Sequence, residues 1–135
     1  MKTNDCIFFQ LSRVSRAAAR YWHKKLASLN VTSAQALVLL FLAEKDKVTA
    51  KYLGQKLEFD SATLTGLIDR MTRADLLERQ AHPQDRRAIL VCLTPQGRKS
   101  VKQILAMVEK DNQAFLSDLT DEEGMILSAL LKKIG

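Results

Sequence analysis

The segment from residue 76 to residue 97 reads LLERQAHPQDRRAILVCLTPQG and carries the clearest structural signal in the chain. Its pattern predicts two short strands, over 76–79 and 89–93. The polar residues between them include a proline and two arginines, which indicates an exposed hairpin tip. Thr94 and Pro95 then predict the N-cap and the first position of a helix, where the missing N–H of proline costs nothing.

A helix with an unusual exposed face is predicted immediately before this hairpin. Asp60 is a good N-cap, and Leu64, Leu67, Ile68 and Met71 recur at helical spacing as one buried stripe. The opposite face is small and hydroxylated near the N-terminus and basic further on, and consists of Ala62, Thr65, Gly66, Asp69 and Arg73. Such a face can enter a groove.

Capping residues and apolar spacing predict five further helices, over 5–29, 32–44, 49–57, 95–117 and 121–134. Three short helices followed by a hairpin are typical of a winged helix-turn-helix, which we place at 32–93. The long helices at 5–29 and 95–135 carry more apolar surface than one small domain covers, so we expect them to form a dimerisation layer. The predicted fold class is mainly α with a small β-hairpin wing, in a single domain spanning 1–135.

Length and composition indicate one globular domain. The chain has 135 residues, of which 47% are hydrophobic and 27% charged. The longest apolar run, 34–43, is too short to span a bilayer, and no leader segment precedes it, so we expect no membrane partner and a cytoplasmic location. Cys6 and Cys92 are too few for a disulfide framework, which suits a reducing compartment.

The charge is unevenly distributed along the chain. The net charge is +6, with an excess of five positive charges over residues 1–30 and three over 51–99, while 100–135 is acidic by two. A basic region of this extent favours contact with a polyanion such as nucleic acid.

Enzymatic chemistry is not expected. His23 and His82 have no cysteine or carboxylate partner at the spacing of metal ligands, and the sequence contains neither a glycine-rich phosphate loop nor a nucleophile elbow. We therefore predict no metal and no cofactor, although two distant histidines could still meet in a folded chain. A further alternative is a protein-interaction dimer that does not bind DNA. The presence of Arg70, Arg73, Arg86 and Arg87 argues against this alternative.

Residues 85–97 resemble the wing signature of the MarR family of bacterial transcription regulators. In that family an Asp-x-Arg at the wing tip precedes an alternating strand and a Leu-Thr-x-x-Gly helix start. Residues 64–71, which read LTGLIDRM, are similar to the family's recognition helix. The resemblance covers nearly the whole chain in element order. It implies a homodimer, an inverted-repeat operator on double-stranded DNA, and repression relieved by a small aromatic or phenolic ligand or by an oxidant.

Both the residues and the resemblance place DNA contacts on the recognition helix and the wing. The helix is expected to enter the major groove, which carries the unambiguous base code. Its candidate contacts are Ser61, Ala62, Thr63, Thr65 and Gly66, with Arg70 and Arg73 holding phosphates or wing residues. Gly66 departs from the family, because many relatives carry a long or charged side chain there. Specificity is therefore expected to depend more on backbone approach, DNA shape and the wing.

The wing tip carries its own set of expected roles. By resemblance, Arg87 inserts into the minor groove, where a narrow A·T tract concentrates negative potential. Arg86 is expected to contact a phosphate. Asp85 is expected to brace Arg87 or Arg70 through an ion pair.

Two sensing chemistries remain open. Some relatives bind aromatic acids beside the dimer layer, and a similar site on the first helix could take its charge and aromatic walls from Arg13, Arg16, Tyr21, Trp22 and His23. The simpler interpretation is a basic helix surface with some aromatic core.

One family subgroup senses organic hydroperoxides through a lone cysteine near the start of its first helix, a role that Cys6 could fill. However, the spacing from Cys6 to Ser15-Arg16 is about two residues longer than in that subgroup, and Tyr21 matches neither partner tyrosine. The simpler interpretation of Cys6 is a half-exposed thiol, and Cys92 is expected to be inert packing.

Overall fold

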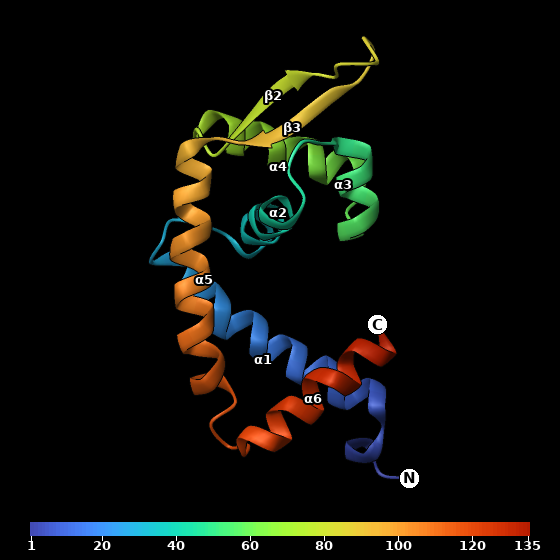
Figure 1. Ribbon diagram of the computed structural model, residues 1–135. Helices are drawn as coiled ribbons and strands as arrows, with labels where there is room; N and C mark the ends of the chain where they lie inside the picture. Colours follow the sequence, from blue (N-terminus) through green and yellow to red (C-terminus); the bar gives the residue numbers. More distant parts are fainter. The chain divides into compact units, whose positions relative to one another are not determined.

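A computed structural model describes all residues, 1–135 (Figure 1). Its elements in chain order are η1 (Thr3–Asp5), α1 (Ile7–Ala27), α2 (Ser33–Glu44), β1 (Val48–Thr49), α3 (Ala50–Leu57), α4 (Ser61–Arg73), β2 (Leu77–Ala81), β3 (Ile89–Leu93), α5 (Pro95–Phe115) and α6 (Asp121–Ile134). They form two compact units, 1–105 and 106–135. The mainly helical fold with a small sheet confirms the predicted fold class.

The sheet is antiparallel with the strand order β1-β3-β2. Strands β2 and β3 pair from Leu77 opposite Leu93 to Ala81 opposite Ile89, and their hairpin projects beyond the helices of the first unit (Figure 1). The predicted hairpin is confirmed. Strand β1 was not predicted, because two residues are too few to show a period, and only its pairing with β3 reveals it.

Side-chain bonds confirm the predicted starts of α2, α3 and α6, whereas α1 begins at Ile7, two residues later than predicted, without a side-chain cap. Thr32 Oγ1 accepts from the Gln35 backbone at 3.1 Å while Gln35 Oε1 accepts from the Thr32 N–H at 3.0 Å, which completes a capping box. Thr120 and Glu123 make the same reciprocal pair at α6. Thr49 caps α3 by accepting from the Tyr52 N–H.

Helix α2 supplies the centre of the core in the first unit. Its residues Val38, Leu39 and Leu42 are completely buried, as are Leu53 of α3 and Met71 of α4. The hydrophobic burial of these side chains stabilises each by about 1.5–3 kcal/mol relative to exposure. Because α4 contributes its whole predicted stripe to this core, its other face is held outward.

The junction between β3 and α5 is tightly built. Thr94 is buried; its hydroxyl donates to the Asp75 carbonyl at 2.5 Å and accepts from the Gly97 N–H at 2.9 Å. Residue 97 must be glycine, because a Cβ there would overlap the carbonyl oxygen of Leu76. The start of α5 is therefore locked to the start of β2.

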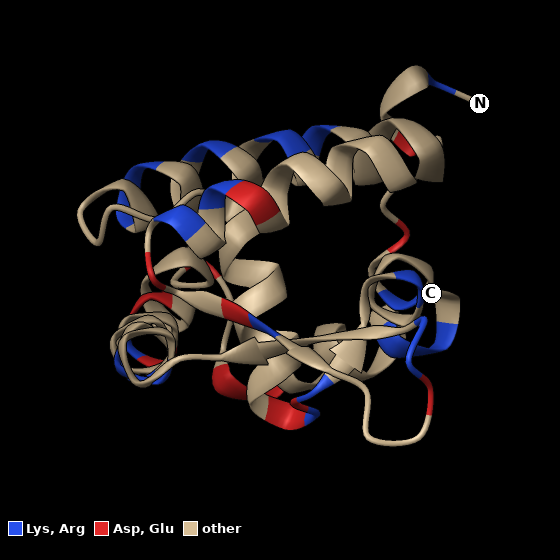
Figure 2. Cartoon of the chain, turned by 90° about the horizontal axis from the view of Figure 1, so that it is seen from above, with Lys and Arg blue, Asp and Glu red and all other residues tan.

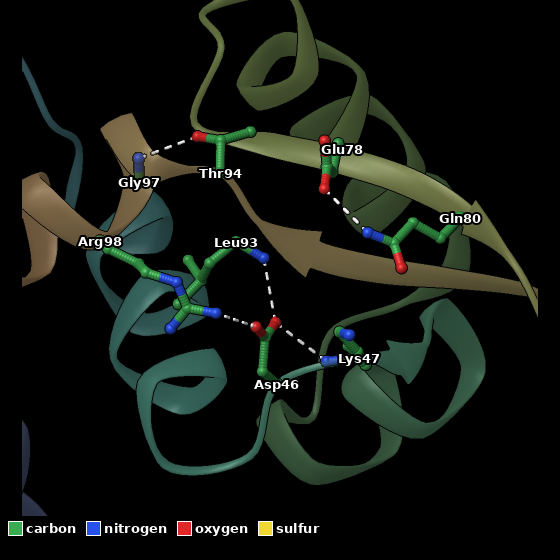
Figure 3. A network of polar contacts seen from close by, with 8 residues as sticks. All are labelled: Asp46, Lys47, Glu78, Gln80, Leu93, Thr94, Gly97 and Arg98. Carbon is green, nitrogen blue, oxygen red and sulfur yellow. Dashed lines mark hydrogen bonds and ion pairs between the residues drawn. The ribbon is translucent and has the colours of Figure 1, made fainter.

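Asp46, in the turn after α2, joins three segments (Figure 3). Its Oδ1 accepts from the N–H groups of Lys47 at 2.9 Å and Leu93 at 3.0 Å. Its Oδ2 accepts from Arg98 Nη2 at 2.7 Å. The partners lie 47 and 52 positions away, so no local sequence pattern indicates these contacts.

Large apolar side chains remain exposed on both terminal helices. On α1 they are Ile7, Phe8, Leu11 and Val14, of which Phe8 is 80% exposed. On α6 they are Met125, Ile126, Leu130, Leu131 and Ile134. No helix combines the length and the apolar character that crossing a membrane requires.

Candidate nucleic-acid interface

Asp60 organises the first turn of helix α4. One carboxylate oxygen accepts from the Thr63 N–H at 2.8 Å, and the other accepts from the Thr63 hydroxyl at 2.7 Å. These bonds favour the charged form and hold the pKa of Asp60 below its ordinary value. The start of the candidate recognition helix is thus fixed before any ligand arrives.

The hydroxyl groups on this turn are not equally available. The Thr63 hydroxyl proton is used by Asp60, and the Thr65 hydroxyl donates to the Ser61 carbonyl at 2.8 Å. Thr63 and Thr65 therefore present methyl groups and oxygen lone pairs, which suit a thymine methyl or a base amino group. The exposed Ser61 hydroxyl makes no bond within the chain and can donate or accept.

The side chain of Arg70 lies beside Gly66. A Cβ at residue 66 would meet Arg70 Nη1 at 3.4 Å, so the guanidinium lies over the turn that contains the glycine. The exposed Arg73 directs its Nε toward the Asp69 carbonyl at 3.4 Å. Both arginines are exposed on α4, and Ala62 is exposed near its N-terminus.

An ion pair connects helix α4 to the wing. The Arg79 guanidinium of β2 binds the Asp69 carboxylate of α4, and their side chains are 39% and 44% exposed. Sequence reasoning placed Asp69 on the outward face and Arg79 in a strand but did not pair them. Their separation of ten positions, across a change from helix to strand, gave no signal for this contact.

The wing tip, residues 82–88, is shaped by local bonds. Asp85 Oδ1 accepts from the Arg87 N–H at 3.0 Å. The ion pair expected between Asp85 and Arg87 or Arg70 is not formed, because the carboxylate folds back onto the backbone of its own turn. Arg86 and Arg87 are consequently exposed with no carboxylate partner, which leaves two positive charges at the end of the hairpin.

A groove of about 440 Å³ separates α3 from the first turns of α4. It is lined by Ala50, Lys51, Gly54, Gln55, Phe59, Ser61, Leu64 and Thr65. Two of the candidate base contacts, Ser61 and Thr65, therefore share a concave surface with a lysine of α3. Sequence reasoning did not include Lys51 among the candidates.

The candidate sensing residues on α1 divide between faces of the helix. Arg13, Arg16 and His23 are exposed, and Lys and Arg recur at successive turns of this helix in Figure 2. Tyr21 and Trp22 are half-buried and pack edge to face at 5.3 Å between ring centroids. At about 100° per residue, Trp22 lies roughly opposite Arg13, so one copy of α1 does not bring these two side chains together.

The two cysteines occupy different environments. Cys6 is half-buried at the N-cap of α1, whereas Cys92 is 1% exposed in β3. Burial, with smaller contributions from Asp46 and Glu78, raises the pKa of the Cys92 thiol and disfavours the reactive thiolate. Tyr21 lies fifteen residues along the same helix from Cys6, about 22 Å away, so it is no partner for that thiol within one copy of α1.

Comparisons of the sequence and of the structure with known proteins all point to the same family. The MarR family profile matches residues 29–88. The organic hydroperoxide resistance transcriptional regulator of Bacillus subtilis is 36% identical over 97 residues, covering 72% of this chain and 66% of that protein. The multiple antibiotic resistance protein MarR of Escherichia coli is 32% identical over 122 residues, covering 90% and 85%. A crystal structure of a mutant E. coli MarR complexed with operator DNA matches with a TM-score of 0.87 and 30% identity, covering 99% of this chain and 98% of that one.

Proposed function

The chain belongs to the MarR family of DNA-binding transcription regulators, and on that basis we propose that it acts as a homodimeric repressor of an inverted-repeat operator. The observation that carries this proposal is the presence of two surfaces on one lobe, the winged helix-turn-helix of residues 32–93. The outward face of α4 presents small, hydroxyl-bearing and basic side chains, and the wing presents Arg86 and Arg87 without carboxylate partners.

In the proposed complex, α4 enters the major groove and the wing reaches the neighbouring minor groove. Ser61, Ala62, Thr63, Thr65 and Gly66 face base edges. Arg70 and Arg73 contact phosphates, as does Arg86, while Arg87 inserts into the minor groove. Removing Arg87 is expected to weaken operator binding by about 1–3 kcal/mol at fixed salt.

The exposed apolar side chains of α1 and α6 support the dimer. An uncovered Phe8, Met125 or Ile134 is costly in water, and a second copy of the chain would cover it. A two-fold dimer also explains an inverted repeat, because two recognition helices must then sit about one helical turn apart, roughly 34–36 Å. Phe8→Glu is expected to shift the mass in sedimentation equilibrium from dimer toward monomer.

The decisive experiment is selection of genomic fragments by the purified protein at two salt concentrations. Recovery of one inverted repeat, preferred over bulk DNA by at least about 10³, supports a sequence-specific regulator. Arg87→Ala should lose affinity for that site, while Lys133→Gln, which removes one positive charge from α6, should not. Binding that is salt-sensitive but blind to sequence would contradict the proposal. Transcription from a promoter carrying the recovered site, with and without protein, distinguishes repression from activation.

We further propose that release follows binding of a small aromatic acid beside α1, with Arg13, Arg16 and His23 supplying charge and Tyr21 and Trp22 supplying aromatic surface. Because Trp22 and Arg13 lie on different faces of α1, such a site would also need groups from other elements. A ligand that prefers the free geometry shifts the population away from the DNA-bound form. Equilibrium dialysis against salicylate at millimolar concentration tests this, and absence of binding would remove the assignment.

A second candidate signal is an oxidant acting at Cys6. It is supported by the similarity to a regulator named for organic hydroperoxide resistance and by the half-buried position of this thiol, in contrast to the enclosed Cys92. Treatment with an organic hydroperoxide should then release DNA from the wild type and from Cys92→Ser, but not from Cys6→Ser. Release from all three proteins, or from none, would contradict a role for Cys6.

A further inference from the structure

A shallow pocket of about 210 Å³ lies between the wing and the start of α3. Its polar lining comes from Lys45, Lys47, Thr49, Tyr52 and His82, and Val48 and Leu90 complete it. No carboxylate lines the pocket, and neither lysine forms an ion pair within the chain. Like charges held together without a counter-charge repel, so an anion placed among them lowers the energy of the arrangement.

Tyr52 presents a polarised hydroxyl to this pocket. Lys45 Nζ donates to Tyr52 Oη at 3.1 Å, so the hydroxyl proton remains available for another acceptor. Lys45 and Lys56 also lie over the ring, with Nζ at 4.6 Å and 5.6 Å from its centroid. The hydrogen bond from Lys45, followed by the positive charges of Lys45 and Lys56, lowers the pKa of Tyr52 and makes its O–H a better donor.

His82 offers a second directed donor. Its Nδ1 accepts from the N–H groups of Gln84 and Asp85, both at 3.1 Å. In the neutral ring the proton therefore resides on Nε2, which makes no hydrogen bond within the chain. The pocket thus combines an imidazole N–H, a phenol O–H and two ammonium groups, and all of them are donors.

The turn that carries Lys45 and Lys47 is held in place by the side chain of Asp46. Lys47 has a left-handed backbone conformation with φ of 57°, which is uncommon for residues other than glycine. The Asp46 carboxylate stabilises it by accepting from the Lys47 N–H while also binding Leu93 and Arg98 (Figure 3). The pocket is therefore preorganised by the same residue that joins β3 to α5.

The first turn of α3 lies between this pocket and the groove beside α4. Thr49 and Tyr52 line the pocket, whereas Lys51, one residue earlier than Tyr52, lines the groove together with Ser61 and Thr65. Donors consequently run from the recognition helix across α3 to the wing. The first helix of a helix-turn-helix crosses the DNA backbone, so a phosphate is expected along this path.

We propose that the pocket formed by Lys45, Lys47, Tyr52 and His82 binds one phosphate of the operator backbone, between the major-groove and minor-groove contacts. This inference depends on the proposed mode of DNA binding and adds a backbone contact to it. We expect this contact to be independent of base sequence, because every nucleotide carries the same phosphate group.

The test is the salt dependence of DNA affinity for Lys45→Gln, Lys47→Gln and Tyr52→Phe. One phosphate neutralised in each pocket adds about 0.9 to the magnitude of the slope of log K against log[salt], which is about 1.8 for the two pockets of the proposed dimer. Each lysine variant should therefore lower this magnitude by a measurable part of about 1.8, and the corresponding loss of affinity should be at most about sixtyfold at 0.1 M salt. The loss should be equal on the selected operator and on random duplex DNA. Tyr52→Phe keeps the ring beneath the lysines and should weaken affinity without changing the slope. Lys102→Gln, on α5 away from the pocket, is the matched control and should change neither quantity.

Unchanged slopes for both lysine variants, in proteins with the circular dichroism spectrum of the wild type, would overturn the assignment. A DNA scan with single neutral methylphosphonates should find one position in each half-site whose effect disappears in Lys45→Gln, and the absence of such positions would also contradict the assignment. Saturable binding of inorganic phosphate without DNA, followed through the NMR signals of His82, would assign the pocket to a free anion instead. If the wild type shows no sequence preference, the regulator proposal fails while these slope differences still test the pocket.

Discussion

The wing is built differently at its base and at its tip. At the base, side-chain bonds from Thr94 and Asp46 join residues that are 19, 47 and 52 positions apart. At the tip, the side chains of His82 and Asp85 bond to backbone groups only two or three positions away. The base is therefore determined by the whole lobe, whereas the tip needs only its own turn. This difference lets the tip carry exposed arginines without affecting stability, and substitutions at the two ends should separate folding from DNA binding.

The largest effect is expected at the base, for Gly97→Ala. The added methyl group would overlap the backbone carbonyl of Leu76, which cannot move without disturbing both β2 and the Thr94 bonds. Overpacking of this kind should lower the free energy of unfolding by roughly 3 kcal/mol. Urea denaturation followed by the fluorescence of Trp22 measures it. Gly124→Ala, where the nearest side-chain atom lies at 3.8 Å, is the control and should not destabilise the protein; equal midpoints for the two variants would contradict the comparison.

Asp46→Ala should have the next largest effect. It leaves the Leu93 N–H and the Arg98 guanidinium without their acceptor, which costs about 1–3 kcal/mol. Asp46→Asn keeps an acceptor for the Leu93 N–H but loses the charge that binds Arg98, so it should lose less stability. If the two variants unfold at the same urea concentration, the backbone bond contributes nothing and the base is held by Arg98 alone.

Local patterns in the sequence were sufficient for most of the lobe. The stripe of Leu64, Leu67, Ile68 and Met71 and the caps at Thr32 and Thr120 all depend on residues within one or two helical turns, and the structure confirms them. The hairpin could be predicted from the sequence because a polar, proline-containing tip separates its two strands.

The side-chain contacts between different elements could not be predicted from the sequence. Asp46 with Arg98 and Asp69 with Arg79 join different elements, and each side chain alone looks like an ordinary solvated charge. Asp85 shows the converse error: proximity to Arg87 predicted an ion pair, yet a bond to the Arg87 backbone satisfies the carboxylate instead. The lysine pocket was missed because Tyr52 and His82 are thirty positions apart and meet only when the wing lies beside α3.

Arg79→Ala tests the difference between the base and the tip of the wing, because it removes a contact between the wing and α4 while leaving the tip residues unchanged. The Arg79–Asp69 pair is partly exposed, so its loss should cost at most about 1 kcal/mol of stability. If the pair positions the wing against α4, however, Arg87 should contribute less to DNA binding once Arg79 is gone. A double-mutant cycle with Arg87→Ala, measured as operator affinity at fixed salt, should give a coupling of at least about 0.5 kcal/mol. Strictly additive losses would show that the two arginines act independently.

The smallest change in stability, and the one with opposite effects on folding and binding, is expected for Gly66→Ala. Alanine is favoured over glycine within a helix by up to about 1 kcal/mol, so the variant should unfold at a higher urea concentration. The new methyl group would lie in van der Waals contact with Arg70 Nη1, at 3.4 Å, so it would restrict the guanidinium and fill space between the α4 backbone and DNA. Operator affinity should therefore fall, and Arg70→Ala should weaken binding less in this background than in the wild type. A variant that gained stability and kept full affinity would show that the glycine serves neither Arg70 nor close approach of the α4 backbone to DNA. If Gly66→Ala instead changed stability and affinity in the same direction, residue 66 would behave like the wing base, where a substitution affects binding only through folding.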